Sequence, residues 1–149
     1  MVCLGNICRS PLAEGILKDK LDPSRFIVES AGTGGWHVGN PPDPRSIEIA
    51  KKRGLDISGQ RAQQFEASFF DHYDLIFAMD QSNFRDLKAM ANSSEQRDKL
   101  SMLLEAIFPG EGVDVPDPYY GGTSGFSEVY DLIDRACNVI AQNIDDKFD

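Results

Sequence analysis

The chain has 149 residues and a net charge of −9, with 41% of its residues hydrophobic and 26% charged. This composition predicts one compact domain over residues 1–149 and argues against nucleic acid as a partner, because neutralising phosphates requires clustered Lys and Arg. The three cysteines exclude a full disulfide framework, and no apolar run is long enough to span a membrane. Without a signal peptide, a reducing, cytoplasmic location is expected.

Strand and helix signals alternate along the chain. In chain order they predict a helix opened by Pro11, a strand at 26–28, a helix at 44–53, a strand at 75–79, a helix at 84–91, a weak strand at 113–115 and a helix from 129 to 144. This alternation is typical of an α/β domain with a parallel sheet, which binds ligands beyond the carboxyl ends of its strands. The loops after Val2, Val28 and Val115 are therefore expected to carry the chemistry.

The loop from Cys3 to Ser10 carries the strongest signal, because it leads directly into a helix. Free N–H groups and the dipole at a helix start attract an anion. Gly5 and Asn6 tolerate the unusual backbone angles of a tight loop. We therefore expect a bound phosphate to be held by a group of loop residues, namely Leu4, Gly5, Asn6, Ile7, Cys8 and Ser10.

Side chains in this loop also suit catalysis. A cysteine in a positive field is expected to be a thiolate, so Cys3 is a candidate in-line nucleophile. Arg9 can grip two phosphate oxygens at once, and Ser10 can donate a hydrogen bond to the sulfur. The Gly-Lys-Ser/Thr ending of a nucleotide-binding loop is absent. The alternative is that Cys3 and Cys8 are small buried residues in a turn.

A second loop offers a general acid. Asp117 lies between two prolines and is followed by Tyr119 and Tyr120. Expulsion of a phenol requires a proton donor, and a bound dianion favours the protonated carboxyl that can supply it. The alternative is a proline-rich surface turn.

A glycine-rich loop at 32–39 contains Trp36, the one tryptophan of the chain. The glycines and Trp36 fit a mobile loop that bears an aromatic residue for recognition; the alternative is that Trp36 packs on the core. His37 and His72 are expected to be surface or packing residues, and they lack the spacing of metal ligands. We therefore expect neither a metal nor a cofactor.

The segment V-C-L-G-N-I-C-R-S-P-L-A-E at 2–14 resembles the low-molecular-weight protein tyrosine phosphatases, as do D-P-Y-Y at 117–120 and S-A-G-T followed by W-x-V-G from residue 30. The resemblance implies a four-stranded parallel sheet with helices on both faces, a flavodoxin-like three-layer sandwich of the phosphotyrosine phosphatase I type. It implies hydrolysis of phosphotyrosine and aryl phosphates through a cysteinyl-phosphate, with release of inorganic phosphate by a monomer. It assigns these roles: nucleophile Cys3, phosphate-binding Arg9, loop-bracing Asn6, sulfur-bonding Ser10, general acid Asp117, and ring-flanking Trp36, Tyr119 and Tyr120.

Further expectations follow from the remaining signals. The family has about five apolar residues before its motif, whereas two residues precede Cys3, so the first strand is expected to be truncated. Asp80 is expected to be a helix cap or loop brace and Cys137 inert core. Cys3 and Cys8 bracket one loop, which predicts a regulatory disulfide unless Cys8 only packs beneath it.

Two rival functions remain open. The first is an arsenate reductase on the same scaffold, although that reaction needs further downstream cysteines and only Cys137 is present. The second is a non-enzymatic phosphate-binding domain, which would be expected to lack the nucleophile or the acid.

Overall fold

The computed structural model describes residues 1–120 and 123–148; for residues 120, 123 and 124 it describes the backbone alone. The strands are β1 (Val2–Cys3), β2 (Ala31–Gly32), β3 (Ile76–Ala78) and β4 (Leu100–Met102). The helices are α1 (Arg9–Lys20), α2 (Pro44–Lys52), α3 (Phe69–His72), α4 (Gln81–Met90), α5 (Ser94–Asp98) and α6 (Thr123–Phe148), with 3₁₀ turns η1 (Leu103–Ala106) and η2 (Pro118–Tyr120).

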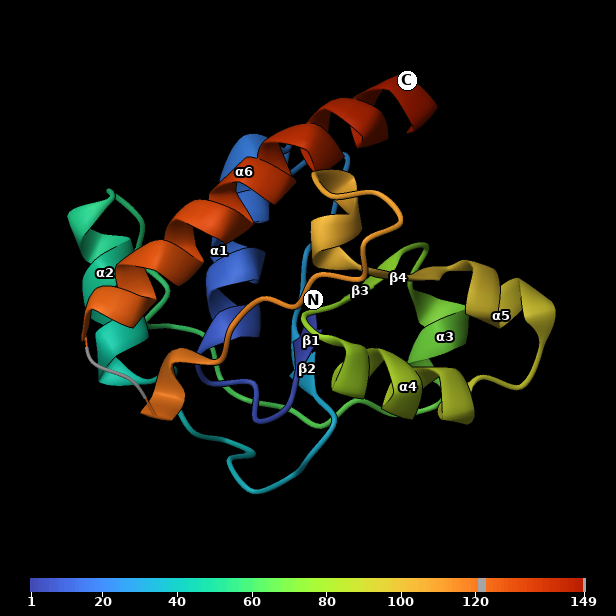
Figure 1. Cartoon of the computed structure of the whole chain (residues 1–149), viewed down its shortest axis with the longest axis horizontal. Helices are drawn as coiled ribbons and strands as arrows, with labels where there is room; N and C mark the ends of the chain where they lie inside the picture. Colours follow the sequence, from blue (N-terminus) through green and yellow to red (C-terminus); the bar gives the residue numbers. More distant parts are fainter. Residues whose placement is uncertain (121–122, 149) are drawn as a thin grey trace.

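Within the described residues, the strands form one parallel sheet in the order β2-β1-β3-β4. Val2 pairs with Ala31 on one side and Ala78 on the other, so β1 is central. Helices α1, α2 and α6 lie on one side of the sheet, and α3, α4 and α5 lie on the other (Figure 1). Met1 and Cys3 join the apolar core on the α1 and α6 side, whereas Val2 joins the core on the α4 side. The expected three-layer α/β architecture is confirmed.

Two strand predictions are wrong. Residues 113–115 form no strand, and the fourth strand is β4, which the sequence reasoning missed. The N–H of Val115 does bond to the carbonyl of Met79, but Pro116 has no N–H with which to continue such pairing. The segment at 26–28 is also not a strand; β2 follows it at Ala31–Gly32.

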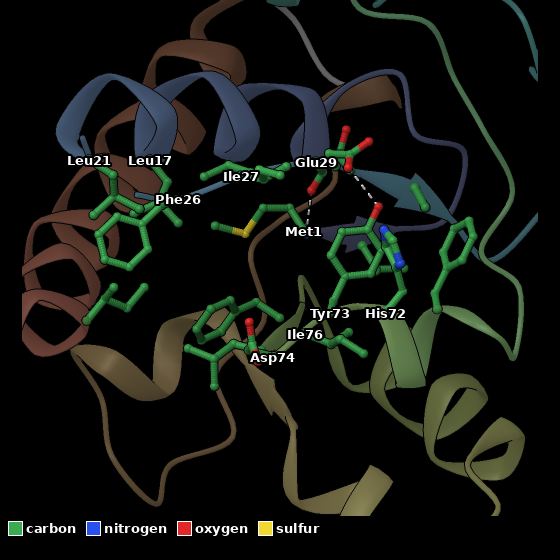
Figure 2. Close-up of a pocket in the computed structure, with 18 of the residues that line it drawn as sticks. Met1, Leu17, Leu21, Phe26, Ile27, Glu29, His72, Tyr73, Asp74 and Ile76 are labelled. Carbon is green, nitrogen blue, oxygen red and sulfur yellow. Dashed lines mark hydrogen bonds between the residues drawn. The ribbon is translucent and has the colours of Figure 1, made fainter. Parts of the chain in front are cut away.

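A groove beside Met1 is lined by residues of this segment. It has a volume of about 380 Å³, and Met1 lies in its middle, with Ile27 and Glu29 on one side and Asp74 and Ile76 on the other (Figure 2). The Met1 ammonium donates to the carbonyl of Glu29 at 3.0 Å, and burial lowers the pKa of this amine to about 6. Within the described part of the chain, no backbone N–H of residues 27–30 donates a hydrogen bond. Residues 26–28 therefore form no strand, although their composition favours one.

Candidate active site

The loop between β1 and α1 is braced from beneath by Asn6. Asn6 has φ 58°, a left-handed conformation that asparagine adopts more readily than most residues. Its side-chain amide donates to Ser10 Oγ at 2.7 Å and to Ser30 Oγ at 3.0 Å, while its Oδ1 accepts from the N–H of Gln63 at 3.0 Å. Because Asn6 is buried, these three bonds satisfy its polar atoms and fix the shape of the loop. The bracing role expected of Asn6 fits this geometry.

The sulfur of Cys3 lies at the end of β1 and receives two polar contacts. The N–H of Asn6 points to Sγ at 3.3 Å, and Ser10 Oγ lies 3.0 Å away. Ser10 Oγ also accepts the amide proton of Asn6, so its own proton is available to the sulfur. Both donors therefore suit negative charge on Cys3. A side chain at Gly32 would meet Leu4 O at 2.8 Å, so only glycine lets β2 approach this loop.

Arg9, the first residue of α1, is oriented by two acceptors from other elements. Its Nη1 donates to Asp80 Oδ2 at 2.7 Å and to the carbonyl of Val115 at 2.9 Å. Its Nη2 lies 3.6 Å from Asp117 Oδ2. Burial opposes the charge, but Cys3 and Asp80 raise the pKa of Arg9 above its ordinary value. The guanidinium is therefore a fixed cation beside the cysteine.

Asp80 combines two functions that the sequence could only partly predict. Its Oδ1 accepts from the N–H of Asn83, which caps α4 as expected. Its Oδ2 holds Arg9, a contact between residues 71 positions apart that sequence reasoning missed. The available signal was the position of Asp80 two residues after the end of β3, the strand that neighbours β1. Asp80 thus caps α4 and also orients the guanidinium of Arg9.

The loop that carries Asp117 is tied to the same arginine. Val115 bonds through its N–H to Met79 and through its carbonyl to Arg9. Asp117 Oδ1 accepts from the N–H of Tyr119 at 3.0 Å, which leaves Oδ2 facing Arg9. The carboxyl is 35% exposed, so solvent protons can reach it. The two predicted catalytic loops therefore meet at one place.

A cavity of about 300 Å³ opens at this meeting point. It is lined by Cys3, Leu4, Gly5, Ile7, Cys8, Arg9, Trp36, His37, Asp117 and Tyr119. Trp36 is 72% exposed and Tyr119 40% exposed, so the alternative that Trp36 packs on the core is wrong. Asn6 and Ser10 lie buried beneath the loop rather than in the lining. The side chain predicted at Tyr120 lies outside the described residues.

Comparisons with known proteins agree with this arrangement. The model of the low molecular weight phosphotyrosine protein phosphatase family matches residues 1–149. A phosphatase of that name from Schizosaccharomyces pombe is 42% identical over 145 residues, which are 93% of this chain and 92% of that protein. The low molecular weight protein-tyrosine-phosphatase YfkJ of Bacillus subtilis is 40% identical over 147 residues, 96% of this chain and 92% of its own. A crystal structure of a protein tyrosine phosphatase from Entamoeba histolytica has a TM-score of 0.90 at 33% identity and covers 98% of this chain and 95% of that one.

The chain belongs to the low molecular weight phosphotyrosine protein phosphatase family. It is therefore an enzyme of the protein tyrosine phosphatase class, as the resemblance implied. The described helices include none that is long and apolar enough to cross a membrane.

One lining residue of this phosphatase site was not predicted. His37 was expected to be a surface or packing residue, yet its ring lies against Gly5 and lines the cavity. Its only sequence signal was its place next to Trp36. His72, by contrast, lines the groove beside Met1, at the end of the sheet where the strands begin. Within residues 1–120 and 123–148, no group of His, Cys, Asp or Glu side chains is arranged to hold a metal ion.

The other two cysteines differ from Cys3 in their surroundings. Burial, assisted by Asp43, raises the pKa of Cys8 to about 12, and burial raises the pKa of Cys137 to about 12. Cys8 nevertheless lines the cavity, whereas Cys137 lies in the core within α6. All three cysteines are buried and free of disulfides. Cys137 is confirmed as a core residue.

Proposed function

We propose that the enzyme hydrolyses phosphotyrosine through a covalent phosphate on Cys3. The observation that carries this proposal is the convergence of Cys3, Arg9 and Asp117 on one cavity. The thiolate of Cys3 attacks phosphorus while Arg9 binds two phosphate oxygens. The S–P bond forms and the P–O bond to the phenol breaks, and the protonated carboxyl of Asp117 gives its proton to the leaving oxygen.

The second step regenerates the enzyme. Asp117, now a carboxylate, takes a proton from water as the water oxygen attacks the phosphorus. The S–P bond breaks, inorganic phosphate leaves, and the sulfur recovers its electron pair under the hydrogen bond from Ser10. No cofactor enters this scheme, because every proton and electron pair is supplied by the side chains and water.

The substrate proposal rests on the mouth of the cavity. Trp36 and Tyr119 present exposed aromatic surface there. Such rings favour a phosphorylated phenol ring in a protein or in a small aryl phosphate over the shorter phosphoserine.

Three free cysteines fit a reducing, cytoplasmic location. We propose that the enzyme acts as a monomer.

Turnover of para-nitrophenyl phosphate and of a phosphotyrosine peptide tests the proposal directly. Rapid quenching should trap one phosphate per enzyme on Cys3. An arsenate reductase would instead oxidise thiols in the presence of arsenate, and it would require further cysteines downstream of the catalytic loop. Cys137 is fully buried within α6, so it does not suit that role. Phosphate binding without turnover would favour a non-enzymatic domain.

Substitution of Asp117 by Asn tests the general acid. We expect kcat/KM to fall about 10²-fold or more for phenyl phosphate, whose leaving group needs a proton, and much less for aryl esters with strongly acidic phenols. The alkaline limb of the rate profile should flatten, because the proton lost at high pH is the one that Asp117 donates. Steady-state kinetics over a series of aryl phosphates measure both effects. An equal loss for all esters would remove Asp117 from this role.

Substitution of Cys8 by Ser tests the predicted redox protection. Peroxide is expected to oxidise Cys3 first, because the thiolate is the reactive form and the high pKa of Cys8 keeps it a thiol. Condensation of the Cys3 sulfenic acid with the Cys8 thiol then forms a disulfide and releases water. Activity regained with dithiothreitol should be several-fold greater for the wild type than for Cys8→Ser. Equal recovery by the two proteins would show that Cys8 only packs beneath the loop.

A further inference from the structure

The start of α2 contacts the catalytic loop by backbone and hydroxyl bonds. The N–H of Asp43 donates to the carbonyl of Ile7 at 2.8 Å. Ser46 Oγ donates to the carbonyl of Cys8 at 3.3 Å. Because these carbonyls belong to the loop that holds Cys3, the first turn of α2 is fixed relative to the nucleophile.

Arg45, in the same turn, contacts the loop that carries Asp117. Its Nη2 donates to the carbonyl of Tyr119 at 3.1 Å. The same guanidinium also donates to Asp43, from Nε to Oδ1 and from Nη2 to Oδ2, both at 3.0 Å. The guanidinium also lies 4.6 Å from the ring centroid of Phe126, at the start of α6. A planar fork held by a carboxylate in this way has little freedom to turn.

The loop of Asp117 is thus attached at both of its ends. At the upstream end Val115 bonds to Met79 and Arg9, and at the downstream end Tyr119 bonds to Arg45. The downstream attachment bears on the acid itself, because the N–H of Tyr119 donates to Asp117 Oδ1. The carbonyl of Tyr119 accepts from Arg45, so the residue that orients the carboxyl of Asp117 is itself held by α2.

We propose that Arg45 is a positioning residue for the general acid: it fixes Tyr119, and through Tyr119 the carboxyl of Asp117, relative to the nucleophile loop. Arg45 acts through Tyr119 and is not among the residues that line the cavity. The inference rests on the proposed role of Asp117. It predicts that loss of Arg45 impairs protonation of the leaving group and leaves attack by Cys3 largely intact.

Arg53 provides a matched control on the same helix. It follows α2 and pairs with Asp131 of α6 at 2.7 Å, with its guanidinium 4.9 Å from the Tyr130 ring. The side chains of Arg45 and Arg53 are 32% and 36% exposed. Each arginine therefore pairs with a carboxylate and contacts an aromatic ring of α6, although the carboxylate of Arg45 is Asp43 of its own helix and that of Arg53 is Asp131 of α6. Of the two arginines, Arg45 is the one that bonds to the acid loop.

The test compares Arg45→Ala with Arg53→Ala over aryl phosphates of different leaving groups. Arg45→Ala is expected to lower kcat/KM about tenfold for phenyl phosphate and less than about twofold for esters of strongly acidic phenols, which steepens the dependence on leaving-group acidity. Arg53→Ala should leave that dependence unchanged. Arg45→Lys should lie closer to Arg45→Ala than to the wild type, since one ammonium cannot hold Asp43 and Tyr119 as a fork does. Thermal unfolding of each variant confirms that folded proteins are compared.

A double substitution separates positioning from general damage. In the Asp117→Asn background, Arg45→Ala should cause less than about a twofold further loss, because the carboxyl that it positions is already gone. A full additional tenfold loss, or a uniform loss for all esters, would overturn the inference. If Asp117→Asn lowers kcat/KM equally for all esters, the proposed role of Asp117 as general acid fails, and the role of Arg45 fails with it. If the loss caused by Asp117→Asn depends on the leaving group and the loss caused by Arg45→Ala does not, only the role of Arg45 fails.

Discussion

Cys3→Ser is expected to abolish hydrolysis while phosphate binding remains. A serine hydroxyl stays protonated at neutral pH, so the nucleophile is lost, and the rate of para-nitrophenyl phosphate turnover should fall at least about a thousandfold. The anion site is made by the loop backbone and Arg9, which the substitution leaves in place. Isothermal titration with inorganic phosphate should therefore give an affinity within a few-fold of the wild type.

Cys137→Ser is the matched control for this experiment. It makes the same chemical change at another buried cysteine, but within α6 and outside the cavity. It is expected to lower the free energy of unfolding by about 1–3 kcal/mol, because a buried hydroxyl needs a partner, and to leave kcat of the folded protein unchanged. Near-normal hydrolysis by Cys3→Ser would show that the covalent mechanism is wrong.

The catalytic loop could be predicted because its signal is local. A cysteine, a glycine, an asparagine and an arginine within seven residues, followed by Pro11, already indicate an anion site at a helix start. The structure differs in one respect: α1 begins at Arg9, so Arg9 and Ser10 belong to its first turn. Asp117 was also found, through the two prolines around it and the resemblance. Such features need no knowledge of distant contacts.

The sheet was harder to predict because its strands contain only two or three residues. In strands this short, pairing partners decide what the propensity of the segment cannot. Residues 26–28 have a strand-like composition, yet the backbone bonds that the described part of the chain shows for Met1 go to Glu29 and Ala31, which follow that segment. β4 became a strand because β3 pairs with it in register, from Ile76 with Leu100 onward. Neither outcome follows from the segment's own residues.

The contacts that orient the catalytic side chains were the hardest to predict from the sequence. Arg9 meets Asp80 across 71 residues, and Arg45 meets Tyr119 across 74. Each of these pairs forms because two elements meet at the carboxyl edge of the sheet, and one sequence gives no distance between them. Asp80 was expected to cap a helix, a role defined by its neighbours, but its hold on Arg9 depends on the order β1-β3.

Arg9→Lys is expected to impair the enzyme in a different way from Cys3→Ser. The guanidinium uses Nη1 for Asp80 and for the carbonyl of Val115, which leaves the Nη2 edge for phosphate next to Asp117. A lysine ammonium is a point charge on a flexible stem, so it cannot hold both acceptors and also bind two phosphate oxygens. We expect kcat/KM to fall on the order of a hundredfold or more, and phosphate affinity to fall with it.

Cys3→Ser and Arg9→Lys are expected to differ in phosphate binding, so the two predictions can be tested against each other. Cys3→Ser should bind phosphate and fail to turn over, whereas Arg9→Lys should lose both binding and turnover, as titration and steady-state kinetics on the same preparations would reveal. Arg53→Lys serves as the control, because it makes the same change in a surface ion pair with Asp131 and should cost less than about 1 kcal/mol of stability. Wild-type kcat/KM in Arg9→Lys would mean that a single positive charge is sufficient, and that the fork held by Asp80 and Val115 has no part in binding phosphate.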